Sequence, residues 1–130
     1  MARTTDITML HFTFDSFITG HHIYKDVWDP VIGEIIQCRR EPSNKYDNNA
    51  VMLFKENLTI GHVPRQIAPY CAYILLNCGT IEAEVTGRRE NQRRNGLEVP
   101  CTYRVKGLKA PTEKGKKCIV EYLERKNANK

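Results

Sequence analysis

The feature that most constrains the fold is a series of short runs in which apolar and polar residues alternate between turn-forming residues. The run LHFTFDSFI, residues 10–18, places Leu10, Phe12 and Phe14 on one face, which is the pattern of a half-buried strand. Other runs with strand character lie at residues 31–41, 50–55, 59–64, 80–88 and 97–105. We therefore expect six short antiparallel strands, with Gly33 as a bulge and Pro100 at an edge or bulge.

Two segments have helical periodicity instead. In the first, apolar side chains recur three and four positions apart at Ile67, Tyr70, Cys71, Ile74, Leu75 and Cys78. Pro69 suits the first turn of this helix, and Gly79 suits its end. A similar stripe in residues 113–126 predicts a short docking helix. The predicted fold is mainly β with α (α+β), a small OB-like six-stranded antiparallel β-barrel with one main helix and a short C-terminal helix.

The bulk composition suits one folded domain spanning residues 1–130. The chain is 41% hydrophobic and 27% charged, which is ordinary for a globular protein. No apolar run is long enough for a secretory signal or a membrane span, so we expect an intracellular protein that does not bind a membrane. Its five cysteines form no C-x-x-C pair, which favours reduced core thiols over disulfides or a zinc site.

Positive charge is concentrated near the C-terminus. The net charge is +5, and residues 104–130 carry nine basic and three acidic side chains. This asymmetry suits a polyanionic partner, although a basic tail also keeps proteins soluble.

Signals for catalysis are weak. The chain has no G-x-S-x-G, H-E-x-x-H or glycine-rich phosphate loop. His21, His22 and His62 make a poor metal set without a nearby carboxylate or cysteine spacing. We expect no enzyme activity, no cofactor and no metal.

Parts suited to nucleic acid are present instead. Single-strand binders combine basic side chains along the backbone with aromatic faces on which bases stack. The stacking candidates are Tyr24, Trp28 and Tyr46, and the phosphate candidates are Arg40, Asn44, Arg65, Arg88, Arg89, Arg93 and Arg94. The alternative for Tyr24 and Trp28 is that they cover one end of the barrel.

The polar turn REPSNKYDNNAV, residues 40–51, carries more than a turn needs. A carboxylate such as Asp47 repels phosphate, so in a nucleic-acid site it is tolerable only where the ligand offers a hydroxyl donor. A strand terminus with a free sugar hydroxyl meets that condition. The alternative is that Asp47 only caps its own turn.

Four segments together resemble the HIRAN domain family. They are GHHIY, then CRREPSNKYDNNAV, then IGHVPRQIA with the following helix, and finally IEAEVTG with LEVPCTYRVKG. The likeness covers about residues 15–107 and leaves the basic tail, residues 108–130.

The resemblance implies an OB-like barrel that captures the 3′ end of single-stranded DNA, as such a module does in a DNA-remodelling helicase. It implies that Tyr46 stacks on a terminal base and that Asp47 accepts a hydrogen bond from the 3′-hydroxyl. Asn44 and Arg65 would address phosphate, with His62 lining the pocket. It further implies a nuclear role in DNA repair or replication-fork processing, with a helicase/ATPase or nuclease module in the same or another chain.

Three positions depart from the family pattern. His22 and Ile23 stand where end-binding members have an Arg and an aromatic residue, unless Tyr24 substitutes, and Leu97 stands in place of a Phe wedge. Losing two stacking faces would weaken binding by about 2–6 kcal/mol. Two alternatives follow: a protein-interaction or scaffold module with a decayed pocket, or end-independent binding through the Arg88–Arg94 loop and the tail.

Overall fold

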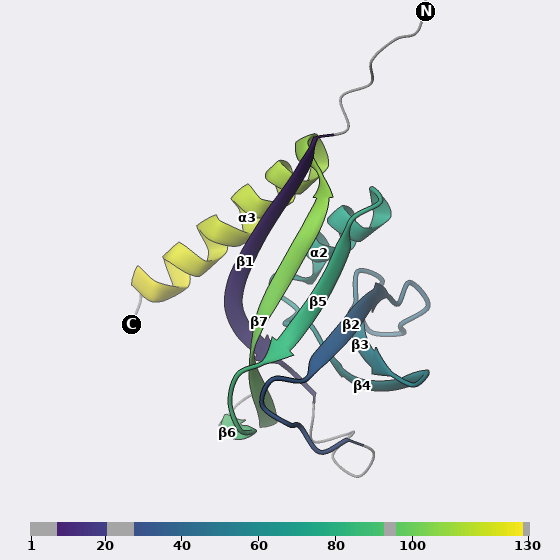
Figure 1. The fold of residues 1–130 in the computed structure, drawn as a ribbon, viewed down its shortest axis with the longest axis vertical. Coiled ribbons are helices and arrows are strands. Elements are labelled where there is room, and N and C mark those ends of the chain that lie inside the picture. Colours follow the sequence, from purple (N-terminus) through teal and green to yellow (C-terminus); the bar gives the residue numbers. More distant parts are fainter. Residues whose placement is uncertain (1–7, 21–27, 93–95, 129–130) are drawn as a thin grey trace, which may run out of the picture.

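The structure is a computed structural model that describes residues 8–20, 28–92 and 96–128. Its main sheet has the order β1-β7-β5-β2-β3-β4, and all of its pairs are antiparallel (Figure 1). The strands are β1 (Met9–Ile18), β2 (Ile35–Arg40), β3 (Val51–Lys55), β4 (Leu58–His62), β5 (Thr80–Val85) and β7 (Gly96–Leu108). A short extra strand, β6 (Glu90–Gln92), pairs with the start of β7. The predicted α+β class and its six main strands are confirmed.

The longest pairing joins β1 to β7 and forms much of the core. Phe12 lies opposite Val105 and Phe14 opposite Tyr103, and all four side chains are buried. The hydroxyl of the buried Tyr103 donates to the carbonyl of Phe17 at 2.8 Å, which satisfies its one polar group. The alternation seen in the sequence therefore marks the inner face correctly.

Pro100 lies inside β7, opposite Phe17 of β1, rather than on an edge strand. The register that pairs β5 with β7 ends at Val85 and Cys101, so it stops one residue short of Pro100. One further bond follows, from the N–H of Thr86 to the carbonyl of Pro100 at 3.0 Å, and the ladder ends there because Pro100 has no N–H to donate in return.

The main sheet curls but does not close fully. In the described part of the chain, its two edge strands, β1 and β4, meet at an isolated bridge after Ile18, where Thr19 and His62 exchange backbone hydrogen bonds of 2.8 and 3.0 Å. Gly61 permits this approach, because a Cβ there would lie 2.5 Å from Cγ2 of Ile18. The term barrel thus applies only loosely.

Helix α2 (Ala68–Leu76) follows the predicted period, with Pro69 in its first turn. Cys71 and Ile74 are buried against the sheet, as expected. Cys78 was wrongly placed on that face: it is exposed and has a φ of 68° beyond the end of the helix. The N–H of Gly79 then bonds the carbonyl of Ile74 at 2.9 Å and closes the helix end.

The C-terminal helix was predicted too short. Helix α3 (Lys109–Ala128) has 20 residues and is longer than α2, which has nine. It runs beside β1 and packs on α2, where Gly115 allows close approach, because a Cβ would lie 2.5 Å from Cδ1 of Ile74 (Figure 1). The apolar stripe of the tail buries Ile119, which explains why this basic segment is ordered as a helix.

The segment before β2 is a turn rather than a strand with a bulge. Gly33 has a φ of 94°, which favours glycine, and its N–H donates to the carbonyl of Val85 at 2.8 Å. Trp28 is only 4% exposed and its ring nitrogen donates to Glu34 at 3.1 Å. Trp28 is therefore a core residue, and its proposed stacking role is wrong.

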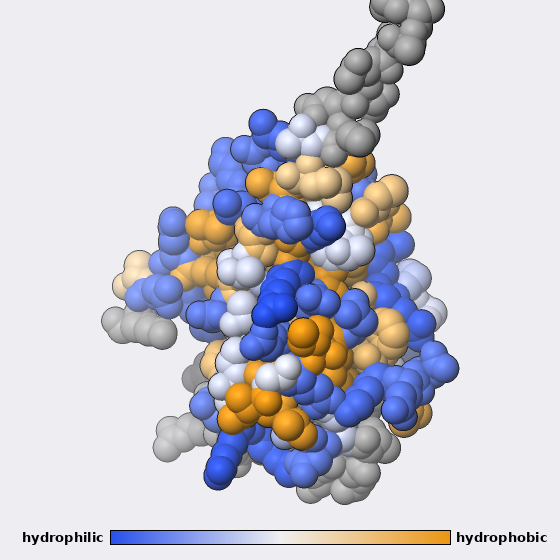
Figure 2. All heavy atoms as spheres, in the orientation of Figure 1, coloured by the Kyte–Doolittle hydropathy of each residue, from blue (hydrophilic) through white to orange (hydrophobic). Residues whose placement is uncertain are grey.

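Polar and apolar side chains are mixed over the face drawn in Figure 2, where apolar patches stand among hydrophilic ones. Val31 and Ile32 are among the exposed apolar side chains of the molecule. Among the helices described, none is both long and apolar enough to span a membrane.

Candidate functional site

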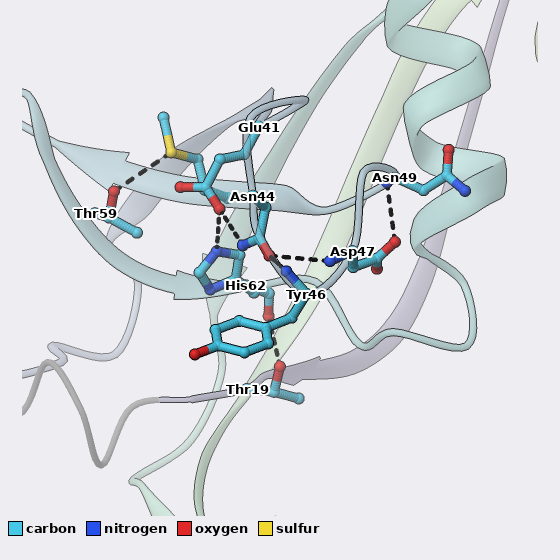
Figure 3. Close-up of polar contacts among 9 residues, drawn as sticks. Thr19, Glu41, Asn44, Tyr46, Asp47, Asn49, Thr59 and His62 are labelled. Atoms are coloured by element: carbon cyan, nitrogen blue, oxygen red, sulfur yellow. Dashed lines mark hydrogen bonds and ion pairs between the residues drawn. The ribbon is translucent and has the colours of Figure 1, made fainter.

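The polar turn between β2 and β3 is organised by one side chain, Asn44. Its oxygen accepts the backbone N–H of Tyr46 at 2.8 Å and that of Asp47 at 3.1 Å (Figure 3). Asparagine commonly replaces a backbone acceptor in this way and so fixes a tight turn. Asn44, which the resemblance assigned to phosphate, here shapes the turn that carries Tyr46 and Asp47.

Glu41 joins this turn to β4. Its Oε1 accepts the side-chain amide of Asn44 at 2.6 Å and lies 2.9 Å from Nε2 of His62. Burial alone would raise the pKa of Glu41, but the hydrogen bonds from Asn44 and His62 outweigh it and lower that pKa from its ordinary value. Glu41 is therefore held ionised between the two side chains.

Tyr46 and Asp47 differ sharply in exposure. Tyr46 is 84% exposed and projects from the turn, whereas the carboxylate of Asp47 is only 20% exposed (Figure 3). Asp47 Oδ1 accepts the backbone N–H of Asn49 at 2.9 Å, so this residue does cap its own turn. Its Oδ2 lies 4.0 Å from Nε of Arg65 and accepts no hydrogen bond from the described residues.

Arg65 connects the turn to the segment that leads into α2. Its guanidinium donates to the backbone carbonyl of Tyr46 at 2.9 Å, while its side chain remains 75% exposed. One edge of the guanidinium is thus used to hold the turn. The remaining N–H groups face solvent beside Asp47 and can still donate to a ligand.

The bridge between Thr19 and His62 brings the end of β1 close to the polar turn. The hydroxyl of Thr19 also donates to the carbonyl of His62 at 3.0 Å. The end of β1, the end of β4 and the polar turn are therefore neighbours, although they come from distant parts of the chain (Figure 3).

Five predicted residues gather here: Asn44, Tyr46, Asp47, His62 and Arg65. Arg40 ends β2 just before the turn. Arg88 and Arg89 follow β5, and Arg89 pairs with Asp29 at 2.8 Å. Leu97 belongs to β7 and lies opposite Asn91 of β6. Arg88 and Arg89 come directly before β6, which lies at the far end of β5 from α2 (Figure 1).

Several predicted residues lie outside the described part of the chain: His21, His22, Ile23, Tyr24, Arg93 and Arg94. Of the three histidines named above, His62 is the one that the structure describes, and its Nε2 lies 2.9 Å from Oε1 of Glu41.

Sequence reasoning missed Glu41 and Thr19. Glu41 precedes a Pro at the start of the turn, where a carboxylate close to two potential donors, Asn44 and His62, could have been noticed. Thr19 carries no comparable signal, because its role depends on the curl of the sheet.

Comparisons with known proteins agree with this architecture. The family model of the HIRAN domain matches residues 11–104. The crystal structure of the HIRAN domain of human HLTF is 22% identical, with a TM-score of 0.68 over 87% of this chain and 91% of that chain.

Two more solved structures share the fold. An NMR structure of the HLTF HIRAN domain in its DNA-bound conformation is 22% identical, with a TM-score of 0.64 over 89% of this chain and 93% of that one. A crystal structure of a protein from Lactobacillus plantarum is 18% identical, with a TM-score of 0.54 over 75% of this chain and 98% of that one. A comparison with curated proteins finds no match. Because the family model matches most of its length, this chain belongs to the HIRAN domain family.

Proposed function

We propose that this chain is a non-enzymatic module that binds single-stranded DNA and recognises its 3′-hydroxyl end. The observation that carries the proposal is the pairing of an exposed aromatic ring, Tyr46, with the open carboxylate oxygen of Asp47 on a fixed turn. Support also comes from the HLTF HIRAN domain, which shares this fold and has a DNA-bound conformation.

The proposed roles follow from the donors and acceptors available. The Tyr46 ring stacks on the terminal base, and Asp47 Oδ2, which can only accept, accepts a hydrogen bond from the 3′-hydroxyl. The free N–H groups of Arg65 bond the last phosphate, which would otherwise be repelled by Asp47. His62 lines the pocket and Asn44 faces the phosphate in this proposal, and both also support the turn through their contacts with Glu41.

The test is fluorescence anisotropy with short labelled oligonucleotides that end in a 3′-hydroxyl or a 3′-phosphate. We expect tighter binding of the hydroxyl end, because a terminal phosphate would place like charges beside Asp47. The logarithm of the binding constant should also fall with the logarithm of the salt concentration, with a slope of about −0.7 per phosphate contacted. Equal affinity for the two ends would remove end recognition from the proposal.

Asp47→Asn sharpens this test. The amide oxygen of Asn can still accept the N–H of Asn49, so the turn should persist while the charge is lost. The variant should therefore bind the hydroxyl end more weakly and lose its discrimination against the phosphate end. Glu56→Gln is the matched control, because it removes one charge at an exposed position in the turn between β3 and β4.

A nuclear role in DNA repair or fork processing, beside a helicase/ATPase or nuclease module, belongs to the same proposal. Co-purification of such an ATPase or nuclease would support it if the association requires DNA. The association should then be lost in a Tyr46→Ala, Asp47→Asn double variant. Association that persists after nuclease treatment would point to a protein-interaction role instead.

A further inference from the structure

A groove of about 720 Å³ runs along the end of β1 and includes Arg65, the residue that also holds the turn. It lies between the last residues of β1, the segment Pro64–Ile67, the start of β7 and the last turns of α3. Thr19 and Arg65 belong both to this groove and to the contacts of the turn described above. A DNA strand whose 3′ end is bound at Asp47 can therefore extend into this groove.

The groove contains one buried acid, Glu98, whose carboxyl has no hydrogen-bonding partner among the described residues. Glu98 lines the groove and is only 6% exposed; its backbone belongs to the pairing of β6 with β7, but its carboxyl makes no hydrogen bond or ion pair with a described side chain. Burial raises the pKa of Glu98, Lys126 opposes that rise and Glu90 adds to it. Because a buried polar group without a partner costs free energy, this carboxyl is suited to a ligand that brings a donor.

The other walls suit a base more than a phosphate. The half-buried Phe17 and Leu123 supply apolar surface for the faces of a flat ring. The cations Arg65 and Lys126 also line the groove and can attract the flanking phosphates, whereas a phosphate against Glu98 would be repelled. What fits beside Glu98 is thus the edge of a base, where carboxylates accept hydrogen bonds from exocyclic amino groups.

We propose that this groove receives the base of one nucleotide close to the 3′ end, and that Glu98 accepts a hydrogen bond from its exocyclic amino group. The assignment rests on the proposed binding of single-stranded DNA, and it adds a preference for bases that carry an amino group. Cytosine and uracil give the cleanest comparison, since uracil replaces the amino donor by a carbonyl acceptor at the same position.

The experiment uses the whole chain and oligonucleotides with a free 3′-hydroxyl, in which each of the last three positions in turn is dC or dU. At one position we expect dC to bind about tenfold more tightly than dU, the size of a hydrogen bond to a charged group. Glu98→Gln, whose amide can both accept and donate, should bring that ratio close to one. The preference for a 3′-hydroxyl over a 3′-phosphate should remain in this variant.

Glu90→Gln is the matched control, because Glu90 lies opposite Glu98 in the pairing of β6 with β7 but does not line the groove. It should retain the preference for dC. Equal binding of dC and dU at all three positions by the unaltered chain would overturn the base subsite, while a persisting hydroxyl preference would leave the proposed function standing. Failure to bind any oligonucleotide would overturn both.

Discussion

His62 Nε2 lies 2.9 Å from Oε1 of Glu41, and this contact joins the end of β4 to the end of β2. A carboxylate oxygen can only accept, so Nε2 carries the proton in this bond. The same oxygen accepts from Asn44, which means that one partly buried acid coordinates both the turn and the strand behind it.

Replacing Glu41 by Gln should therefore lower stability in a pH-dependent way. The pKa of Glu41 is lowered from its ordinary value of 4.5, because hydrogen bonds from Asn44 and His62 outweigh the opposing effect of burial. Its contribution is present above about pH 4.5 and disappears as the pH falls through the folded-state value. In urea unfolding, the free energies of the two proteins should differ by about 1 kcal/mol at neutral pH and converge in acid. A constant difference at every pH would contradict this account.

Asn44→Ala should destabilise the turn and weaken DNA binding together. It removes the acceptor for two backbone N–H groups and the donor to Glu41, at a cost of about 1–3 kcal/mol in the free energy of unfolding. Chemical denaturation and anisotropy would measure the two effects. Asn48→Ala, at an exposed position in the same turn, should leave both nearly unchanged. A stable Asn44→Ala variant with full affinity would show that the turn does not depend on this side chain.

Tyr46 should matter for binding and not for folding, because its side chain is 84% exposed. Tyr46→Ala should weaken oligonucleotide binding by about 1–3 kcal/mol, the range for one stacked base. Tyr46→Phe retains the ring and should bind almost as the unaltered chain does. Thermal unfolding should be the same for all three proteins. If Tyr46→Ala binds normally, the exposed ring has another role.

Gly61→Ala should disturb the place where β4 meets β1. The new Cβ would lie 2.5 Å from Cγ2 of Ile18 and 3.0 Å from the carbonyl oxygen of Thr19. Overpacking of this kind should destabilise the fold by about 1–3 kcal/mol, measured by urea unfolding. Gly87→Ala is a milder control, since its nearest contact would be Cγ of Pro100 at 3.2 Å. Equal stability of the two variants would argue against a tight junction.

The strands were predictable because their alternation reports directly which face is buried, as at Phe12 and Phe14. Helix α3 was underestimated because the pattern used to predict it covers only residues 113–126, whereas the helix begins at Lys109 and is anchored on α2 through Gly115 and Ile74. Local pattern carries no information about such a distant partner. The same limit explains the error at Trp28, whose polar surroundings in sequence conceal a core position.

The site was predictable in part for a similar reason. The residues of the turn are close in sequence, so Asn44, Tyr46 and Asp47 could be grouped by motif. Glu98 and Thr19 join the neighbourhood only through strand pairing and the curl of the sheet. No local signal distinguishes a carboxyl that lines a groove from one that faces solvent.

The pair of backbone hydrogen bonds between Thr19 and His62 has a further consequence. Among the residues that the structure describes, the seam between β1 and β4 is closed by these two bonds and by the hydroxyl of Thr19, so we expect it to open locally before the rest of the sheet unfolds. A ligand that contacts both β1 and β4 binds only the closed form of the seam. Its binding therefore shifts the opening equilibrium toward the closed form, more so the higher its affinity. Slowed deuterium uptake at these two amides would register occupancy of the domain even where no side chain moves.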